Sequence, residues 1–365
     1  MRSGPGNLPL ILKEAAGPAK PKLTPEQIAK QALAAKATLA AVDQFVIPSY
    51  RTLAQATDAQ EKAWAAFAAN RQAGNFAALR TSYATACDAW ARAQIVKTGP
   101  IGLFLRYDRF AYWPEARNVT TRTLDALLKS RDPKELTPET LARDNVAAQG
   151  LTALERLLYD GDMPEALLKG QGEDAAWRVA VGLGIARNLA AIAKDVLADW
   201  TASDGVRTAI AANKPWRAIF ADTPEAASLL LTDLVSAFRV MHDIKLLPVM
   251  GANADAARPR VAESWRSNRA SRNLLLNLQA SEAMTKPFAA EITAANRNKL
   301  VTLYASANKA VAALPADLGE AAADAKRRPL VEAARAAIKA VQTEMAVSIP
   351  SDLGVTLGFN SLDGD

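Results

Sequence analysis

The stretch VGLGIARNLAAIAKDVLADW, residues 181–200, decides the fold class of this chain of 365 residues. Its large apolar side chains recur every three or four positions, which is the spacing of one face of an α-helix. They are Val181, Ile185, Leu189, Ile192, Val196 and Trp200. No phosphate-loop pattern follows Gly182 and Gly184, so these glycines predict close packing against another helix. The stretch therefore predicts a long amphipathic helix.

The same periodicity extends outward in both directions. Helices are predicted over residues 24–45, 53–70, 76–96, 119–129, 138–159, 223–241, 260–280, 291–313 and 320–345. The first begins at Thr24 with the pattern of a capping box, and Val46-Ile47-Pro48 is expected to bend or break it. Alanine is the strongest helix former and supplies much of the apolar fraction, while no run alternates as a strand does. The predicted fold class is all-α.

The helices divide into two sets of about four long members each, and residues 161–173 contain glycines suited to a boundary. We therefore expect two up-and-down four-helix-bundle-like domains packed side by side. The expected divisions are a flexible leader (1–23), a first helical bundle (24–170), a second helical bundle (171–347) and a C-terminal segment that packs back on the bundles (348–365).

Composition excludes several classes of function. The net charge is +6, but the excess is spread along the chain without basic blocks, which argues against nucleic acid as a partner. With one cysteine, Cys87, and one histidine, His242, the chain cannot build a zinc site of the Cys/His type. Cys87 is expected to be a buried thiol, and His242 a packed histidine or one nitrogen ligand in a site made of carboxylates. The Gly-x-Ser-x-Gly elbow of serine hydrolases is missing from the sequence.

Membrane and export signals are also missing from the sequence. No apolar run approaches the length of a membrane span, and residues 1–22 lack the apolar stretch of a signal peptide. The expectation is a cytoplasmic protein, or an exported one whose signal or lipid anchor has been removed.

Five segments together resemble the imelysin family, also grouped as insulin-cleaving membrane proteases and iron-regulated proteins. They are Val46-Ile47-Pro48-Ser49-Tyr50, Gly99-Pro100 with Tyr112-Trp113-Pro114, Gln149-Gly150-Leu151-Thr152-Ala153-Leu154-Glu155, Glu263-Ser264-Trp265-Arg266-Ser267, and Gly358-Phe359-Asn360 with Asp363-Gly364-Asp365. The resemblance implies a periplasmic or outer-membrane-associated protein linked to iron uptake or its regulation. It also implies a polar site between the two bundles.

The family signature Gly-x-His-x-x-Glu is altered in this chain. Gly150 and Glu155 match it, but Thr152 stands where the histidine belongs. A threonine hydroxyl is a weak metal ligand and a poor base at neutral pH, so the metallopeptidase activity that the resemblance implies is in question. The alternatives at Glu155, which lies along an apolar helix face, are a salt bridge, a ligand or cation site, and catalysis.

Two further clusters are candidates for the same site. Arg109 and Trp113 supply a charge and a large ring, either as a pocket wall or as an aromatic plug. Glu263, Ser264 and Arg266 supply polar groups from the second half, either as a ligand site or as a salt-bridge network. The predicted ligand-binding set is Gly150, Thr152, Glu155, Arg109, Trp113, Glu263, Ser264 and Arg266, with Glu155 and His242 as candidates for a metal.

The expected function is that of a non-enzymatic envelope protein that binds a small ligand or another envelope protein. If the site holds a metal, its oxygen donors imply a hard ion such as iron or calcium. The alternatives are a metallopeptidase of the imelysin type and a structural or interaction module.

Overall fold

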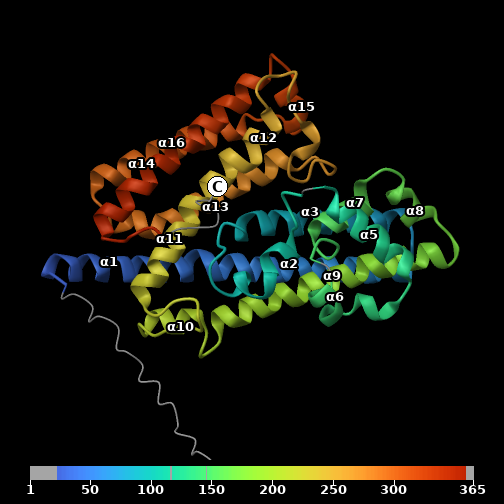
Figure 1. Ribbon diagram of the computed structural model, residues 1–365, viewed down its shortest axis with the longest axis horizontal. Helices are drawn as coiled ribbons and strands as arrows, with labels where there is room; N and C mark the ends of the chain where they lie inside the picture. The colour runs from blue at the N-terminus through green and yellow to red at the C-terminus, as the bar shows by residue number, and fades with distance from the viewer. Residues whose placement is uncertain (1–22, 116, 145, 359–365) are drawn as a thin grey trace, which may run out of the picture.

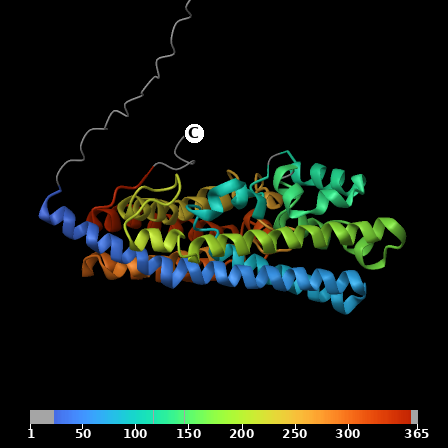
Figure 2. The ribbon, with the colours of Figure 1, turned by 90° about the horizontal axis from the view of Figure 1, so that it is seen from below.

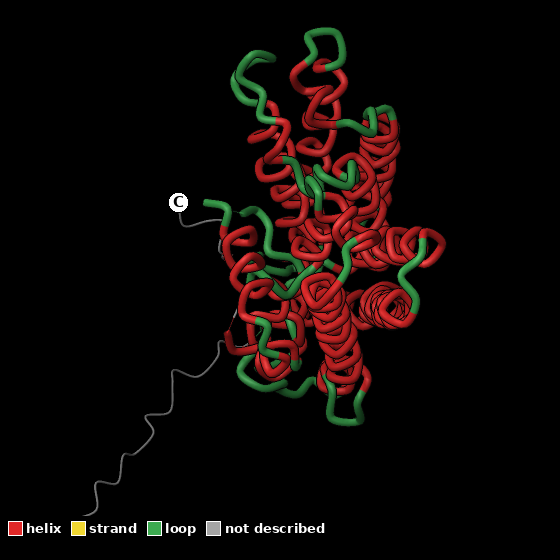
Figure 3. The backbone as a smooth tube through the Cα atoms, turned by 90° about the vertical axis from the view of Figure 1, so that its right-hand side faces the viewer, coloured by secondary structure: helices red, strands yellow, loops and turns green. Residues whose placement is uncertain are grey.

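The chain is all-α, as predicted, in a computed structural model that describes residues 23–115, 117–144 and 146–358. Within those ranges no strand is formed, and a single bridge joins Trp216 to Phe220. Helices follow one another through short loops along almost the whole described path (Figure 3). None of the described helices combines the length and apolarity of a membrane span.

The first bundle contains the helices that lie in the lower and right-hand part of Figure 1. Its members are α2 (Ile47–Ala69), α3 (Ala73–Ala93), η2 (Pro100–Leu105), α4 (Arg106–Phe110), α5 (Val119–Ser130), η3 (Pro133–Leu136), α6 (Pro138–Asp144), α7 (Leu151–Tyr159), α8 (Met163–Lys169), α9 (Gly172–Thr201) and α10 (Val206–Ala211). The long helix α2 packs along both α3 and α9, and α7 closes the bundle against α3 and α9.

The second bundle lies above the first in Figure 1. Its members are α11 (Thr223–Arg239), η4 (Val240–Leu246), α12 (Leu247–Met250), η5 (Pro259–Val261), α13 (Ala270–Ala290), α14 (Ala294–Ala312), α15 (Leu318–Ala323) and α16 (Arg328–Leu353). Helices α11, α13, α14 and α16 form its core, and α13 also contacts α3 of the first bundle. The two bundles therefore lie side by side, with α3 and α13 along their shared boundary.

The amphipathic stretch at residues 181–200 is the central part of α9, and every apolar side chain of its predicted face is buried. Gly182 lies where α9 crosses α2. A Cβ added there would stand 2.2 Å from the ring of Trp64, which is itself fully buried. The glycine thus permits the close helix packing that the sequence predicted. Residues 172–201, which were expected in the second bundle, pack against α2 of the first.

Helix α1 (Pro25–Ala41) and α2 form one continuous rod, seen lengthwise in Figure 2. The capping box predicted at Thr24 is present. The expected bend at Pro48 is replaced by a π-helical turn, η1 (Val42–Val46), directly before Ile47. A proline lacks the N–H for the usual helical hydrogen bond, and the wider turn accommodates this without breaking the helix. The turn η4 stands in the same relation to Pro248, two residues after its end.

Two predicted helices are interrupted. Residues 138–159 are divided between α6, which ends at Asp144, and α7, which begins at Leu151. Directly before α7, the backbone at Gly150 passes so close to the segment of Arg109 and Phe110 that a Cβ would lie 2.8 and 2.7 Å from their carbonyl oxygens. The helix expected over 260–280 begins at Ala270 instead, after Ser264 and Asn268 adopt left-handed backbone angles. Left-handed residues end a right-handed helix, so the segment before α13 is a series of turns.

The segment after α16 lies against α11 as far as it is described. Ser228 donates to the carbonyl of Thr356, and the N–H of Gly358 donates to Thr232 Oγ1 at 2.9 Å. The leader at residues 1–22 and the last residues, 359–365, lie outside the described ranges, as do most of the quoted C-terminal motif residues.

Candidate functional site

Glu155 is the first candidate that the fold places at the boundary of the two bundles. It lies on α7 among buried leucines and is only 2% exposed. Its Oε1 accepts hydrogen bonds from the backbone N–H and the hydroxyl of Ser267, at 2.9 and 2.7 Å. Burial raises the pKa of Glu155, while the two bonds from Ser267 and the charge of Arg266 lower it. A buried carboxylate of the first bundle is thus held by the second.

Glu263 forms a second buried polar centre on the other side of this boundary. Its Oε2 accepts from Lys245 Nζ at 2.7 Å and from the amide of Asn273 at 3.1 Å. Lys245 also donates to Asn277 Oδ1 at 2.7 Å, and the Asn277 amide donates to the carbonyl of Ala91 on α3. The lysine charge is therefore neutralised by a carboxylate and linked through an amide to the first bundle.

The two centres belong to one hydrogen-bonded path. The Asn273 amide reaches Ser264 Oγ at 3.4 Å, and the Ser267 hydroxyl lies 3.2 Å from the carbonyl of Ser264. We call this path the seam network, and it consists of Glu155, Ser267, Ser264, Asn273, Glu263, Lys245 and Asn277. It runs between the bundles and is fastened to the first bundle at both ends. The prediction that Glu155 approaches the 263–266 segment agrees with this geometry.

A small cavity lies at the Lys245 end of the seam network. It has a volume of about 20 Å³, enough for one molecule the size of water. Its lining residues are Gln94, Ile95, Lys97, Tyr107, Asp233, Ala237, Val240, Lys245 and Asn277. Asp233 accepts from the backbone N–H groups of Lys97 and Thr98, at 2.9 and 2.6 Å, and burial raises its pKa to about 6. Burial lowers the pKa of Lys97.

Several buried polar atoms along this boundary have no hydrogen-bond partner within the described residues, and three of them are neutral amide or hydroxyl atoms in or beside the seam network. They are Thr152 Oγ1, Asn273 Oδ1 and Gln94 Nε2. Thr152 stands one helical turn before Glu155, Asn273 belongs to the seam network, and Gln94 lines the small cavity. Buried polar atoms are nearly always paired, because an unpaired one costs free energy. The seam network therefore has buried hydrogen-bond donors and acceptors in it and beside it that could bind a further polar group.

Trp113 and Arg266 lie beside the seam network without belonging to it. Lys245 Nζ lies 5.8 Å from the centre of the Trp113 ring, within the range of a cation–π contact. Arg266 stacks on Trp265, and its Nε lies 3.2 Å from Asp160 Oδ2 beyond the end of α7. Arg266 therefore joins the bundles by a salt bridge, which is one of the two roles expected for its cluster.

Three other predicted residues do not enter the seam network. Gly150 precedes α7 and serves the close backbone approach described above. Arg109 binds Gln149 and Asn188 inside the first bundle. His242 is buried, and its two ring nitrogens lie 2.6 and 2.7 Å from side-chain oxygens of Gln342 and Asp243.

The side chains at this boundary do not fit a catalytic metal ion. Across the described part of the chain, no three His, Cys, Asp or Glu residues stand together as ligands would. The motif position that would carry an imidazole is Thr152, and one oxygen of Glu155 is already occupied by Ser267.

Lys245, Ser267, Asn273 and Asn277 are parts of the seam network that were not predicted. Three of them, Ser267 and the two asparagines, had a signal in the sequence. Ser267 ends the Glu-Ser-Trp-Arg-Ser segment, and the two asparagines stand four residues apart among leucines. Polar side chains that repeat on an otherwise apolar helix face are buried with it, so they need partners there.

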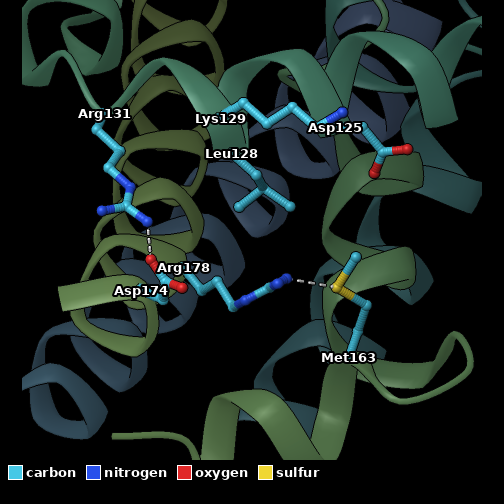
Figure 4. Close-up of a pocket in the computed structure, with 7 residues that line it drawn as sticks. All are labelled: Asp125, Leu128, Lys129, Arg131, Met163, Asp174 and Arg178. Atoms are coloured by element: carbon cyan, nitrogen blue, oxygen red, sulfur yellow. Dashed lines mark hydrogen bonds and ion pairs between the residues drawn. The ribbon is translucent and has the colours of Figure 1, made fainter. Parts of the chain in front are cut away.

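A larger cavity, of about 510 Å³, lies away from this boundary, between α5, α8 and α9 (Figure 4). Asp125, Leu128, Lys129, Arg131, Met163, Asp174 and Arg178 line it. Arg131 pairs with Asp174, and Arg178 reaches across to the sulfur of Met163. None of the predicted site residues belongs to this cavity.

Comparison with known proteins points to one family. A family model described as imelysin matches residues 46–345. An imelysin-like protein from Psychrobacter arcticum 273-4 superposes with a TM-score of 0.73 at 18% identity, covering 90% of this chain and 98% of that one. A protein described as an iron-regulated protein A precursor, from Parabacteroides distasonis ATCC 8503, superposes with a TM-score of 0.71 at 16% identity, covering 92% and 97%. No curated protein matches the sequence.

Proposed function

The chain belongs to the imelysin family, and on that premise we propose that it is a non-enzymatic cell-envelope protein that binds a small polar ligand along the seam network. The ligand contacts Thr152 and Glu155 from the first bundle and Asn273 from the second. Binding therefore depends on how the two bundles meet.

The observation that carries this proposal is the group of unpaired buried atoms beside the seam network. A fold that needed the network only as a clamp would be more stable with those positions apolar, because unsatisfied polar groups cost about 1–3 kcal/mol each. A ligand that supplies the missing partners offsets that cost. Small-molecule sites commonly combine an apolar surround with a few convergent polar groups at a domain boundary.

A metallopeptidase is the alternative that the donor set disfavours. Peptide hydrolysis by a metal needs an activated water held in an open coordination position. Thr152 and the Ser267-bound Glu155 do not provide the histidine and free carboxylate for that role. We therefore assign Glu155 to ligand binding.

The link to iron rests on the resemblance and on the description of the Parabacteroides distasonis neighbour. We propose that the ligand is an iron complex in which a small organic acid surrounds the ion, because a polar site can hydrogen-bond the acid without supplying metal ligands itself. The cavity at the seam holds only a molecule the size of water, so binding of this complex requires the two bundles to separate along the seam network. The same relationships support placing the protein in the envelope.

Equilibrium dialysis against iron(III) citrate labelled with radioactive iron tests this function. Wild-type protein is expected to retain the label. Glu155→Gln is expected to bind at least about tenfold more weakly, because it loses a charge-assisted hydrogen bond. Glu344→Gln is the matched control, since Glu344 also accepts from a serine, Ser348, but lies on α16 in the second bundle.

A parallel digest of unfolded casein separates binding from hydrolysis. We expect no cleavage by wild-type protein. Cleavage that Glu155→Gln abolishes would establish the peptidase instead. Equal retention of iron citrate by wild type and Glu155→Gln would remove the seam network as the site, and no retention by either would refute the iron link.

A further inference from the structure

Arg109 is a buried cation without an anion. The residue is 7% exposed, and its guanidinium makes three hydrogen bonds inside the first bundle. Nε donates to Gln149 Oε1 at 2.8 Å, Nη2 to Asn188 Oδ1 at 3.2 Å and Nη1 to the carbonyl of Phe104 at 3.5 Å. All three acceptors are neutral, and within the described ranges no carboxylate lies within 4.0 Å of this guanidinium.

An unneutralised charge at this depth is costly. Removing an ion from water is compensated only by an opposite charge in good geometry, as Glu263 provides for Lys245. For Arg109 the strongest effect of a neighbouring charge comes instead from another cation, Arg106. Burial, and after it the charge of Arg106, lowers the pKa of Arg109, while Asp195 raises it to a smaller extent. The carboxylate of Asp199 is paired with Arg106 at 2.9 Å, so it does not neutralise the charge of Arg109.

The segment that covers Arg109 is strained and held by few contacts. Phe104 and Leu105 have φ angles of 56° and 54°, which are left-handed values that cost free energy for any residue with a Cβ. Their side chains are 70% and 58% exposed, although both are large and apolar. We call residues 103–105 the strap. Of its three side chains only Leu103 packs against the core, and the Phe104 ring lies 5.4 Å from the guanidinium carbon of Arg106.

We propose that Arg109 anchors a binding site for a small oxyanion, a carboxylate or a phosphate, and that the strap closes this site in the structure described here. When the strap lifts, Nη1 loses only a long hydrogen bond to the Phe104 carbonyl. The planar guanidinium then presents a fork that matches either oxyanion with two parallel hydrogen bonds.

The neighbours of Arg109 keep it in place for this role. Asn188 donates to Gln149 Oε1 at 3.0 Å, and Gln149 donates to the carbonyl of Leu141. The guanidinium is therefore held from α9 and from the segment before α7, while the strap supplies its third and weakest contact. None of these residues belongs to the seam network, so the inference stands or falls independently of the proposed function.

Isothermal titration at constant ionic strength tests the inference, with inorganic phosphate and citrate in separate arms. Saturable binding of either supports it, and the arm that binds identifies the oxyanion. Arg109→Gln is expected to abolish that binding. Absence of saturation in both arms, or unchanged affinity in Arg109→Gln, overturns the inference.

Variants of the strap provide a test that does not alter the buried cation. Phe104→Gly and Leu105→Gly each remove a left-handed penalty from the closed strap, which favours closure. Each is expected to weaken oxyanion binding about fivefold. Val347→Ala, at another exposed apolar position, on α16, is the control and should leave the affinity unchanged. Equal affinities for the glycine variants and wild type would show that the strap does not cover the site.

Discussion

Replacing Lys245 by methionine should destabilise the protein severely, because it leaves Glu263 as a buried charge without its partner. The Nζ–Oε2 distance is 2.7 Å, and the two side chains are 5% and 10% exposed. At an effective dielectric constant of about 20, unit charges at that distance attract by about 6 kcal/mol, and desolvation cancels much of this. Removing one partner loses the attraction but keeps the desolvation cost of the other.

The expected loss for Lys245→Met is about 3–5 kcal/mol of unfolding free energy, measured by urea denaturation followed by circular dichroism. Adding Glu263→Gln to Lys245→Met should recover about half of that loss, because it removes the stranded charge while the amide oxygen still accepts from Asn273. The control is Lys169→Met. It breaks an exposed ion pair with Glu165 and should change stability by less than about 0.5 kcal/mol.

Two results would refute this reasoning. A loss below about 1 kcal/mol for Lys245→Met would mean that water reaches Glu263 and screens its charge. A further loss when Glu263→Gln is added would mean that the carboxylate is stabilised by partners other than the lysine. Either result would mean that the buried ion pair does not stabilise the second bundle as this reasoning requires.

Three further predictions concern single positions. The pKa of Asp233 is raised from 3.8 to about 6, so between these pH values the folded state binds a proton that the unfolded state has lost. The wild-type protein should therefore lose about 2–3 kcal/mol of unfolding free energy as the pH rises from 4 to 6. Asp233→Asn should remove this decline, as measured by urea denaturation across that pH range. Gly182→Ala should cost about 1–3 kcal/mol in the same assay, because the new methyl group overlaps the Trp64 ring; no loss would mean that α2 and α9 separate easily. Burial raises the pKa of Cys87 to about 12, so its thiol should resist Ellman's reagent at pH 8 until urea unfolds the chain; rapid labelling of the native protein would contradict its burial.

The helices of this protein could be predicted from periodicity wherever one apolar face stays continuous. The Val181–Trp200 face is the clearest example, and every one of its predicted core residues is buried. Periodicity failed where backbone geometry ends a helix without proline. Ser264 and Asn268 adopt left-handed backbone angles, and Gly150 lies against the carbonyl groups of a distant segment. Neither constraint is visible within a short window of sequence.

The candidate site could be predicted only in part, because the sequence indicates which polar residues are buried but not where their side chains point. Glu155 stood out because a charge on an apolar face needs a partner, and the motif resemblance directed attention to residues 263–266. The actual partner is Ser267, the next residue along, whose hydroxyl and N–H both reach the carboxylate. Arg109 was placed in the same site, yet its guanidinium turns away toward Asn188 on α9. Side-chain direction depends on the irregular segment before α4, which periodicity does not describe.

The π-helical turn Val42–Val46 has a mechanical consequence for the whole molecule. Before this turn, α1 packs its buried face against α11 and α13. After the turn, α2 packs its buried face against α3 and α9. One additional residue in a turn rotates everything beyond it by about 100° around the axis. Deleting a single residue there would restore an ordinary helix, but then only one bundle at a time could receive its matching face. The five-residue π-helical turn thus sets the rotation of the buried face of α1 relative to that of α2, and with it the orientation of the two bundles that share this rod.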